Sequence, residues 1–184
     1  LRRMFYDEEA LKTDEEFFHS PYYRFLKFLA LSGMRSGEVR ALRYKQFNKD
    51  NPNILTVNAA FKTNSRDKRD IGLPKWDKVR VIYLCDSALE TVGEIGNDTD
   101  FVFTDKDGKP LRAEGIGKAF DKYLKKVDKR MREGGSSFLK DDKRFTPHTL
   151  RGSLNSMLIN YAGRYEGRVV TLDSFWVQYY FGWT

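Results

Sequence analysis

Cysteine is nearly absent from this chain of 184 residues: Cys85 is the single cysteine, and there are two histidines. One cysteine excludes an internal disulfide bond, and so few cysteine and histidine residues leave no zinc site of the usual spacing. Because Tyr83, Leu84 and Ala88 flank Cys85, we expect a buried structural thiol rather than a nucleophile.

Long hydrophobic runs are also missing. No apolar stretch approaches the ~18 residues of a membrane-spanning helix, and the charged, aromatic N-terminal segment is unlike a signal peptide. The sequence contains no phosphate-loop glycine motif, no His-Glu-x-x-His motif and no Gly-x-Ser-x-Gly motif. We therefore expect a soluble protein of a reducing compartment.

Positive charge is in excess, because 33 lysine and arginine residues face 26 aspartate and glutamate residues, a net charge of +7. The length suits one domain with a substantial core. A basic domain favours polyanionic partners, such as nucleic acid or an anionic membrane surface, and the net charge does not choose between them.

A helix–break–helix pattern surrounds Arg35. An apolar helix leads to Gly33, which can adopt a positive φ and end it. Ser36 is expected to cap the second helix, with Glu38 in its first turn, where an acidic group suits the helix dipole. Arg35 is thereby fixed at a corner, where it either meets an oxyanion from one direction or pairs with a nearby carboxylate.

A hairpin with a basic tip is predicted next. The β-branched run Ile54–Val57 reads as a strand that extends toward Phe61, and residues 70–74 read as a short returning strand. The connection between them begins at Lys62 and is polar and strongly basic. Such a tip either contacts an anionic partner or is a solvated loop. Its further cations are Arg66, Lys68 and Arg69.

The next regions carry weaker patterns. Residues 76–96 show a helical pattern that an apolar run over 79–84 interrupts. Gly115–Met131 is predicted to be a basic amphipathic helix with Lys118 and Lys122 on its outer face. That face either lies along phosphates or is solvated. Near the end of the chain, residues 163–167 read as a linker before a last apolar helix over 169–180.

A second candidate anion site lies at the start of a helix near residue 147. Thr146 can cap this helix, and Pro147 suits its first position. His148 and Arg151 are three positions apart and therefore share a helix face. The free N–H groups and the helix dipole favour an anion there. The alternative is a capping histidine beside a surface arginine.

Four motifs follow one another along the chain. They are Gly33-Met34-Arg35 with Glu38, Lys62 before the strand Ile71-Gly72-Leu73-Pro74, Pro147-His148-Thr149-Leu150-Arg151, and Gly182-Trp183. In this order they resemble the catalytic domain of the tyrosine recombinases, the phage-integrase family. The likeness spans nearly the whole chain. It implies one α+β domain over residues 1–184, mostly helical, with a small antiparallel sheet or hairpin on one side.

The resemblance also implies roles for the residues of these motifs. Arg35 and Arg151 would bind the scissile phosphate, whose charge grows in the transition state of phosphoryl transfer. Lys62 would be the general acid for the departing 5′ oxygen, with Lys68 as the alternative. His148 would hydrogen-bond the phosphate or assist proton transfer.

Two further roles and the partners follow from the same resemblance. Trp183 would supply an indole N–H donor, and Glu38 would orient its neighbours rather than react. The DNA contacts would come from Arg66, Lys68, Arg69, Lys118 and Lys122. The implied partners are duplex DNA and further copies of the chain in a multimer on DNA, in the bacterial cytoplasm. A membrane partner is not expected, and neither is a metal or another cofactor.

One feature of the family is missing from the printed residues. The nucleophilic tyrosine of tyrosine recombinases follows the Gly-Trp motif, whereas Tyr179 and Tyr180 precede it and are expected to be core aromatics. We interpret the chain as a fragment without this tyrosine segment and without the preceding DNA-clamping domain, and expect it to be inactive alone. The alternatives are a DNA-binding module without chemistry and a metal-dependent nuclease, which needs clustered carboxylates.

Overall fold

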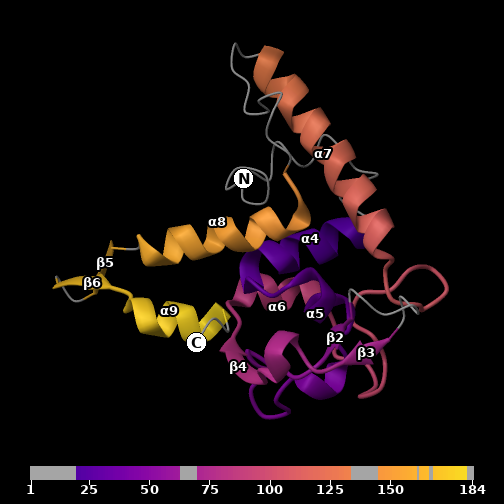
Figure 1. The fold of residues 1–184 in the computed structure, drawn as a ribbon, viewed down its shortest axis with the longest axis horizontal. Helices are drawn as coiled ribbons and strands as arrows, with labels where there is room; N and C mark the ends of the chain where they lie inside the picture. The colour runs from indigo at the N-terminus through magenta and orange to yellow at the C-terminus, as the bar shows by residue number, and fades with distance from the viewer. Residues whose placement is uncertain (1–19, 63–69, 134–144, 161, 166–167, 182–184) are drawn as a thin grey trace.

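The computed structural model describes residues 20–62, 70–133, 145–160, 162–165 and 168–181. Most of the secondary structure in these ranges is helical, and the strands form small antiparallel pairs (Figure 1). The architecture is therefore the predicted α+β class. In chain order the elements are α4 (Pro21–Ser32), α5 (Ser36–Arg40), η1 (Tyr44–Gln46), β1 (Ile54–Val57), β2 (Ala60–Phe61), β3 (Ile71–Gly72), η2 (Lys75–Asp77), β4 (Arg80–Tyr83), α6 (Asp86–Val92), α7 (Ala113–Glu133), α8 (Pro147–Ile159), β5 (Ala162–Tyr165), β6 (Arg168–Thr171) and α9 (Ser174–Phe181).

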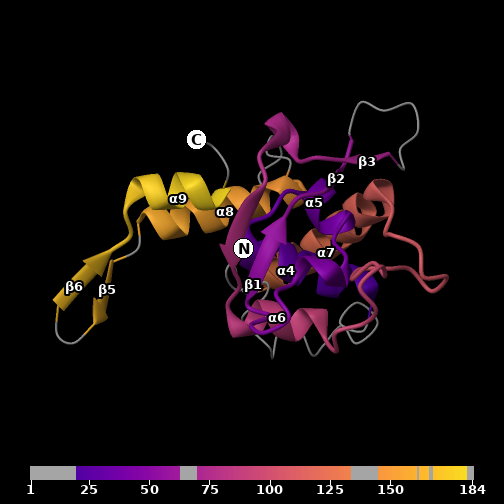
Figure 2. The same cartoon turned by 90° about the horizontal axis from the view of Figure 1, so that it is seen from below.

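Helix α4 is the centre of the core. It begins as predicted, because the Ser20 hydroxyl accepts a hydrogen bond from the Tyr23 amide at 3.2 Å and Pro21 takes the first turn. It ends at Gly33, which has a φ of 63° and donates to the Leu29 carbonyl at 3.1 Å. Helices α6, α7 and α8 all pack against α4 (Figures 1 and 2).

The second helix of the corner begins differently from the prediction. Arg35, not Ser36, occupies the N-cap position of α5, and Ser36 is the first helical residue. Glu38 is the third residue of α5, and its Oε2 accepts a hydrogen bond from the amide of the N-cap residue Arg35 at 2.8 Å. Glu38 thus lies in the first turn, as predicted, but its side chain turns back onto the corner.

Two strand pairs lie beside the corner. β2 and β3 form the predicted hairpin, with Phe61 opposite Ile71, and its basic connection over 63–69 lies outside the described residues. β1 pairs with β4, with Leu55 opposite Ile82. The apolar run over 79–84, which interrupts the predicted helical pattern, contains β4, whose residues alternate between buried and exposed positions as in a half-buried strand.

Cys85 also differs from the prediction. It is exposed, because it follows the end of β4 and occupies the N-cap position of α6, at the edge of the core. The buried neighbours Leu84 and Ala88 point inward from positions on either side of it. The expectation of a buried thiol is therefore wrong, although its neighbours Leu84 and Ala88 are buried.

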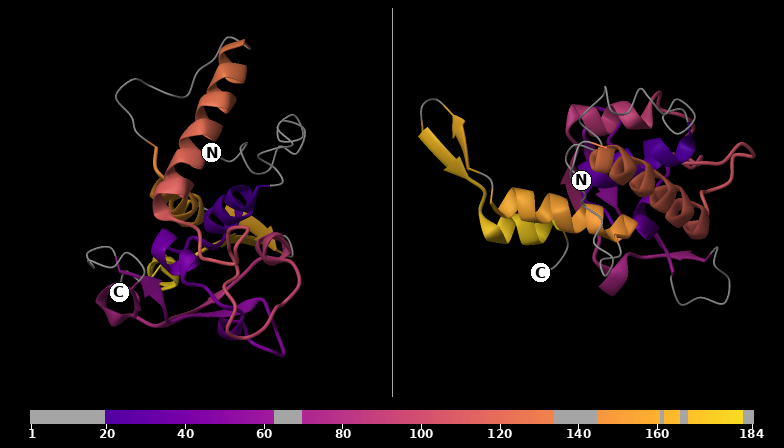
Figure 3. Two further views of the ribbon diagram at one scale, coloured as in Figure 1. Left: turned by 90° about the vertical axis from the view of Figure 1, so that its right-hand side faces the viewer. Right: turned by 90° about the horizontal axis from the view of Figure 1, so that it is seen from above.

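Helices α7 and α8 form where the sequence predicts them. α7 is longer than predicted, and it rises from the body of the fold (Figures 1 and 3). Its buried positions include Ile116, Phe120 and Leu124. In α8, Thr146 is the N-cap and Pro147 the first residue. No helix among the described residues is long and apolar enough to cross a lipid bilayer.

The segment after α8 is a second hairpin, so the predicted linker over 163–167 is wrong. β5 and β6 pair with Gly163 opposite Val170, and the hairpin extends away from the body as an arm (Figure 3, right). Helix α9 returns along α8 and contacts β4. Tyr180 is buried as expected, whereas Tyr179 is 55% exposed because α9 covers the body with one face only.

Candidate active site

Arg35 stands at the corner between α4 and α5, as the sequence predicts. Its side chain is 18% exposed, and its Nη1 donates to Oε1 of Glu38 at 3.0 Å. The backbone of Arg35 is held as well, because its amide donates a hydrogen bond to the same carboxylate. One acid thus fixes both ends of Arg35, and the residue remains partly open to solvent.

Arg151 reaches the same corner from α8. Its side chain is buried, Nη1 donates to the Gly33 carbonyl and Nη2 donates to the Phe181 carbonyl. Burial, followed by repulsion from the charge of Arg35, lowers the pKa of Arg151 to about 9. Arg151 is therefore still a cation at neutral pH, and its bond to the Gly33 carbonyl places its guanidinium group at the corner that carries Arg35.

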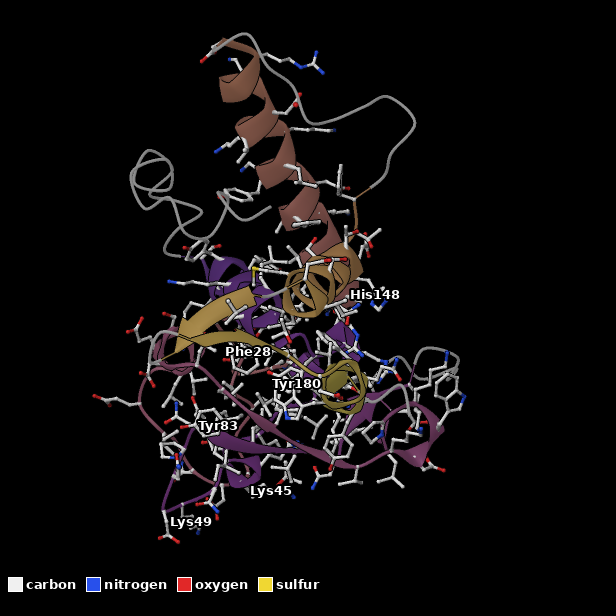
Figure 4. The ribbon with its side chains drawn as sticks, turned by 90° about the vertical axis from the view of Figure 1, so that its left-hand side faces the viewer. Phe28, Lys45, Lys49, Tyr83, His148 and Tyr180 are labelled. Carbon is white, nitrogen blue, oxygen red and sulfur yellow. The ribbon has the colours of Figure 1, made fainter. Side chains whose placement is uncertain are left out.

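His148 lies one helical turn before Arg151, on the surface of α8 (Figure 4). Partial burial lowers the pKa of His148, and the positive charges of Arg151 and Arg35 lower it further. Such charge effects act over short distances at the surface of a protein. The structure therefore brings Arg151 of α8 to the corner that carries Arg35, and His148 lies one helical turn before Arg151 on the same helix.

A third arginine, Arg80, was not identified from the sequence. It is buried on β4, and its Nη1 and Nη2 bind the two carboxylate oxygens of Glu38 at 3.0 and 2.8 Å. Its Nε donates to the Tyr180 carbonyl at 3.0 Å. The available signal was strand alternation, since Arg80 shares the inward face of β4 with Ile82.

Glu38 is fully buried between these arginines. Burial by itself raises the pKa of this carboxyl, but the hydrogen bonds and charge of Arg80, together with those of Arg35, lower it overall. Glu38 is therefore an anion at neutral pH. With Arg35, Arg80 and Arg151 it forms what we call the arginine cluster, which carries two net positive charges. A cluster with this charge favours an anion at its open side.

Lys62 lies on the hairpin beside the cluster. Lys62 directly follows strand β2, which packs against α5: the Phe61 carbonyl oxygen is 3.0 Å from the position that a Cβ on Gly37 would take. The side chain of Lys62 is exposed, and its Nζ donates to the Leu73 carbonyl at 3.1 Å. The structure thus places Lys62 next to α5, with its ammonium held by its own hairpin.

The remaining predicted site residues are not part of this cluster. Lys118 and Lys122 are exposed on α7, as predicted for its outer face, and the Lys118 ammonium pairs with Glu114 at 2.7 Å. Among the described residues, no group of three or more histidine, cysteine, aspartate or glutamate side chains is arranged to hold a metal ion. Four predicted residues lie outside the described residues: Arg66, Lys68, Arg69 and Trp183.

Comparisons with solved structures define the class of this fold. The Tn1549 transposon integrase, in complex with a circular intermediate DNA, superposes with a TM-score of 0.72 at 20% identity, over 96% of this chain and 55% of that one. XerA recombinase gives a TM-score of 0.58 at 20% identity, over 98% of this chain and 51% of that one. XerH recombinase, bound to a palindromic difH substrate in a post-cleavage complex, gives a TM-score of 0.51 at 19% identity, over 95% of this chain and 44% of that one.

The fold is therefore that of a tyrosine recombinase catalytic domain, and the chain spans about half the length of these solved chains. Residues 8–164 match the phage integrase family. This chain belongs to the phage integrase family. A search of curated proteins found no match.

Proposed function

We propose that this chain is a catalytic domain of a tyrosine-type site-specific DNA recombinase. Such a domain contributes to cleaving and rejoining DNA strands through a 3′-phosphotyrosine link. The observation that carries the proposal is the meeting of Arg35 and Arg151, which are far apart in the sequence and come to one partly open corner, where Arg151 bonds the Gly33 carbonyl. Two fixed guanidinium groups suit one phosphate that gains charge in the transition state.

The roles of the other groups follow from their positions. His148, beside both arginines, would hydrogen-bond the phosphate or move a proton. Lys62 would protonate the leaving 5′ oxygen once DNA draws its ammonium from the Leu73 carbonyl. Lys68 is the alternative acid, and Trp183 would donate its indole N–H. Glu38 would orient Arg35 without touching the substrate.

The proposed partners are duplex DNA and further copies of the chain on DNA. The net charge of +7 supports an anionic partner. Arg66, Lys68 and Arg69 of the hairpin tip would contact phosphates, with Lys118 and Lys122 of α7 as weaker candidates. The Tn1549 integrase and XerH structures contain DNA, which supports the same partner for this chain.

A covalent-adduct assay tests the proposal. The chain, with any residues that its gene encodes after Thr184, is incubated with nicked suicide duplexes that represent the DNA flanking that gene. We expect a denaturation-resistant protein–DNA adduct, its loss in Arg35→Ala, and its retention in Arg24→Ala, since Arg24 binds the Thr91 and Val92 carbonyls on α6 instead. DNA binding without any adduct would instead support a non-catalytic DNA-binding module.

A further inference from the structure

All three nitrogen atoms of the Arg80 guanidinium group donate hydrogen bonds. Nη1 and Nη2 bind the two oxygens of Glu38, and Nε binds the Tyr180 carbonyl at the end of α9. The side chain is 3% exposed. A guanidinium bonded on three sides and enclosed by the core cannot rotate, so the plane of the Glu38 carboxylate is fixed with it.

Glu38 passes this constraint to Arg35. Its Oε1 accepts from both Arg80 and Arg35, at 3.0 Å each, and its Oε2 accepts from Arg80 and from the Arg35 amide, at 2.8 Å each. The carboxylate is thus shared between two arginines that lie on opposite sides of it. One of them is buried and the other is partly open to solvent.

The charges lead to the same conclusion. A carboxylate alone beside Arg35 would neutralise it and compete with an incoming anion. Because Arg80 offsets the charge of Glu38, the positive charge of Arg35 stays available at the open side. A lysine at position 80 would keep the positive charge but would not fix the plane of the Glu38 carboxylate, because an ammonium group lacks the planar, two-pronged geometry of a guanidinium.

We propose that Arg80 is a positioning residue of the anion site: it acts through Glu38 to hold Arg35 in the direction of the bound phosphate. This inference rests on the proposed function, since it takes Arg35 as a phosphate ligand. Arg80 itself lies behind Glu38 and does not touch the substrate.

The test measures the affinity of the 184-residue chain for inorganic phosphate, with sodium chloride at matched ionic strength as the reference. The readout is the ring resonance of His148, which is assigned with a His19→Gln variant because the chain has two histidines. The variants are Arg80→Lys, which keeps the charge, Arg35→Ala, and the double variant. Arg24→Lys is the matched control, because that arginine also bonds backbone carbonyls but lies at the α4–α6 contact.

We expect Arg80→Lys to weaken phosphate binding by about tenfold, the value of one charge-assisted hydrogen bond. The same change should have no further effect in the Arg35→Ala background, because residues that act through one another are not additive. Arg24→Lys should bind phosphate as the unmodified chain does. Thermal unfolding of each variant separates a loss of folding from a loss of affinity.

Two results would overturn the role of Arg80 while leaving the site intact: unchanged affinity in Arg80→Lys, or an equal loss with and without Arg35. A third result, no phosphate binding above the chloride reference in the unmodified chain, would overturn the proposed phosphate site itself and this inference with it. The failures of the two proposals are therefore distinguishable.

Discussion

The guanidinium group of Arg151 donates a hydrogen bond to the carbonyl oxygen of Gly33, 118 residues earlier in the chain. This contact joins the helix start that carries His148 to the corner that carries Arg35. The second bond of Arg151, to the Phe181 carbonyl, brings the end of α9 to the same point. Arg151 thus joins the end of α4 and the end of α9 through hydrogen bonds to their backbone carbonyls.

Gly33→Ala tests how tightly this corner is packed. An added Cβ would lie 2.5 Å from the Phe181 ring and 3.0 Å from Leu154, and Gly33 has a positive φ of 63°. Gly108→Ala is the matched control, since Gly108 has a φ of 71° but nothing within 4 Å. We expect a loss in the free energy of unfolding of about 1 kcal/mol for Gly108→Ala and about 2–4 kcal/mol for Gly33→Ala. Equal losses in urea unfolding would contradict the packing of α9 on the corner.

Glu38→Ala removes the buried anion and leaves Arg35 and Arg80 without their shared carboxylate. Breaking a buried ion pair on one side costs about 3–5 kcal/mol. The control is Glu114→Ala, which removes an exposed pair with Lys118 and should leave the free energy of unfolding nearly unchanged. A Glu38→Ala chain as stable in urea as the control would show that the arginines do not depend on this acid.

The decrease in the free energy of unfolding at acidic pH should also depend on Glu38. The pKa of its carboxyl is lower in the folded chain than the ordinary 4.5, so the unfolded chain binds more protons as the pH falls below that value. The contribution is present above about pH 4.5 and is lost as the pH falls through the lowered pKa. Unfolding measured between pH 7 and pH 3 should therefore show a shallower decline for Glu38→Gln than for the unmodified chain, and equal slopes would contradict the shift.

His148 reports the charge of the site directly. Partial burial and the charges of Arg151 and Arg35 lower its pKa from 6.5, so between the lowered value and 6.5 the folded chain binds fewer protons than the unfolded chain, and stability rises with pH there. An NMR titration should show a higher His148 pKa in Arg35→Ala and on addition of inorganic phosphate. A His148 pKa that neither change affects would place the histidine outside the anion site.

Lys62 can be tested as a general acid by changing the leaving group. In the chain with any residues that its gene encodes after Thr184, we expect Lys62→Ala to slow strand cleavage by about 10²–10⁴-fold. A substrate whose 5′ oxygen is replaced by sulfur needs no proton and should be cleaved by this variant at nearly the unmodified rate. Lys49→Ala is the control, because that lysine pairs with Asp98 on the surface. Failure of the sulfur substrate to rescue Lys62→Ala would shift the role to Lys68.

Local signals in the sequence predicted the parts of the fold that short segments determine. Pro21, Gly33 and Pro147 mark helix ends that the structure confirms, because capping and positive φ depend on nearby residues. The corner of Arg35 and the face shared by His148 and Arg151 followed from the same signals. Their meeting at one point could be inferred only from the family resemblance, since long-range packing leaves no local pattern.

The features that the sequence did not reveal depend on tertiary contacts. Arg80 lies within an apolar run, and only the pairing of β4 with β1 and the position of Glu38 show it to be a partner of the site. Ser36 carries a capping side chain, yet Arg35 is the N-cap, and the Glu38 carboxylate binds its amide. The glycines at positions 163 and 167 of the sequence favour a linker, yet Gly163 lies within β5, because pairing with β6 outweighs its weak strand preference.

The central claim is that Arg35 and Arg151 bind one backbone phosphate of DNA, and a crystal structure of this chain with a short duplex tests it most directly. The measurement is the distance from each guanidinium group to the nearest phosphate oxygens. We predict that both groups lie within about 3.2 Å of oxygens on the same phosphate, with His148 beside it. Guanidinium groups bound to different phosphates, or DNA seated on another face of the fold, would contradict the account.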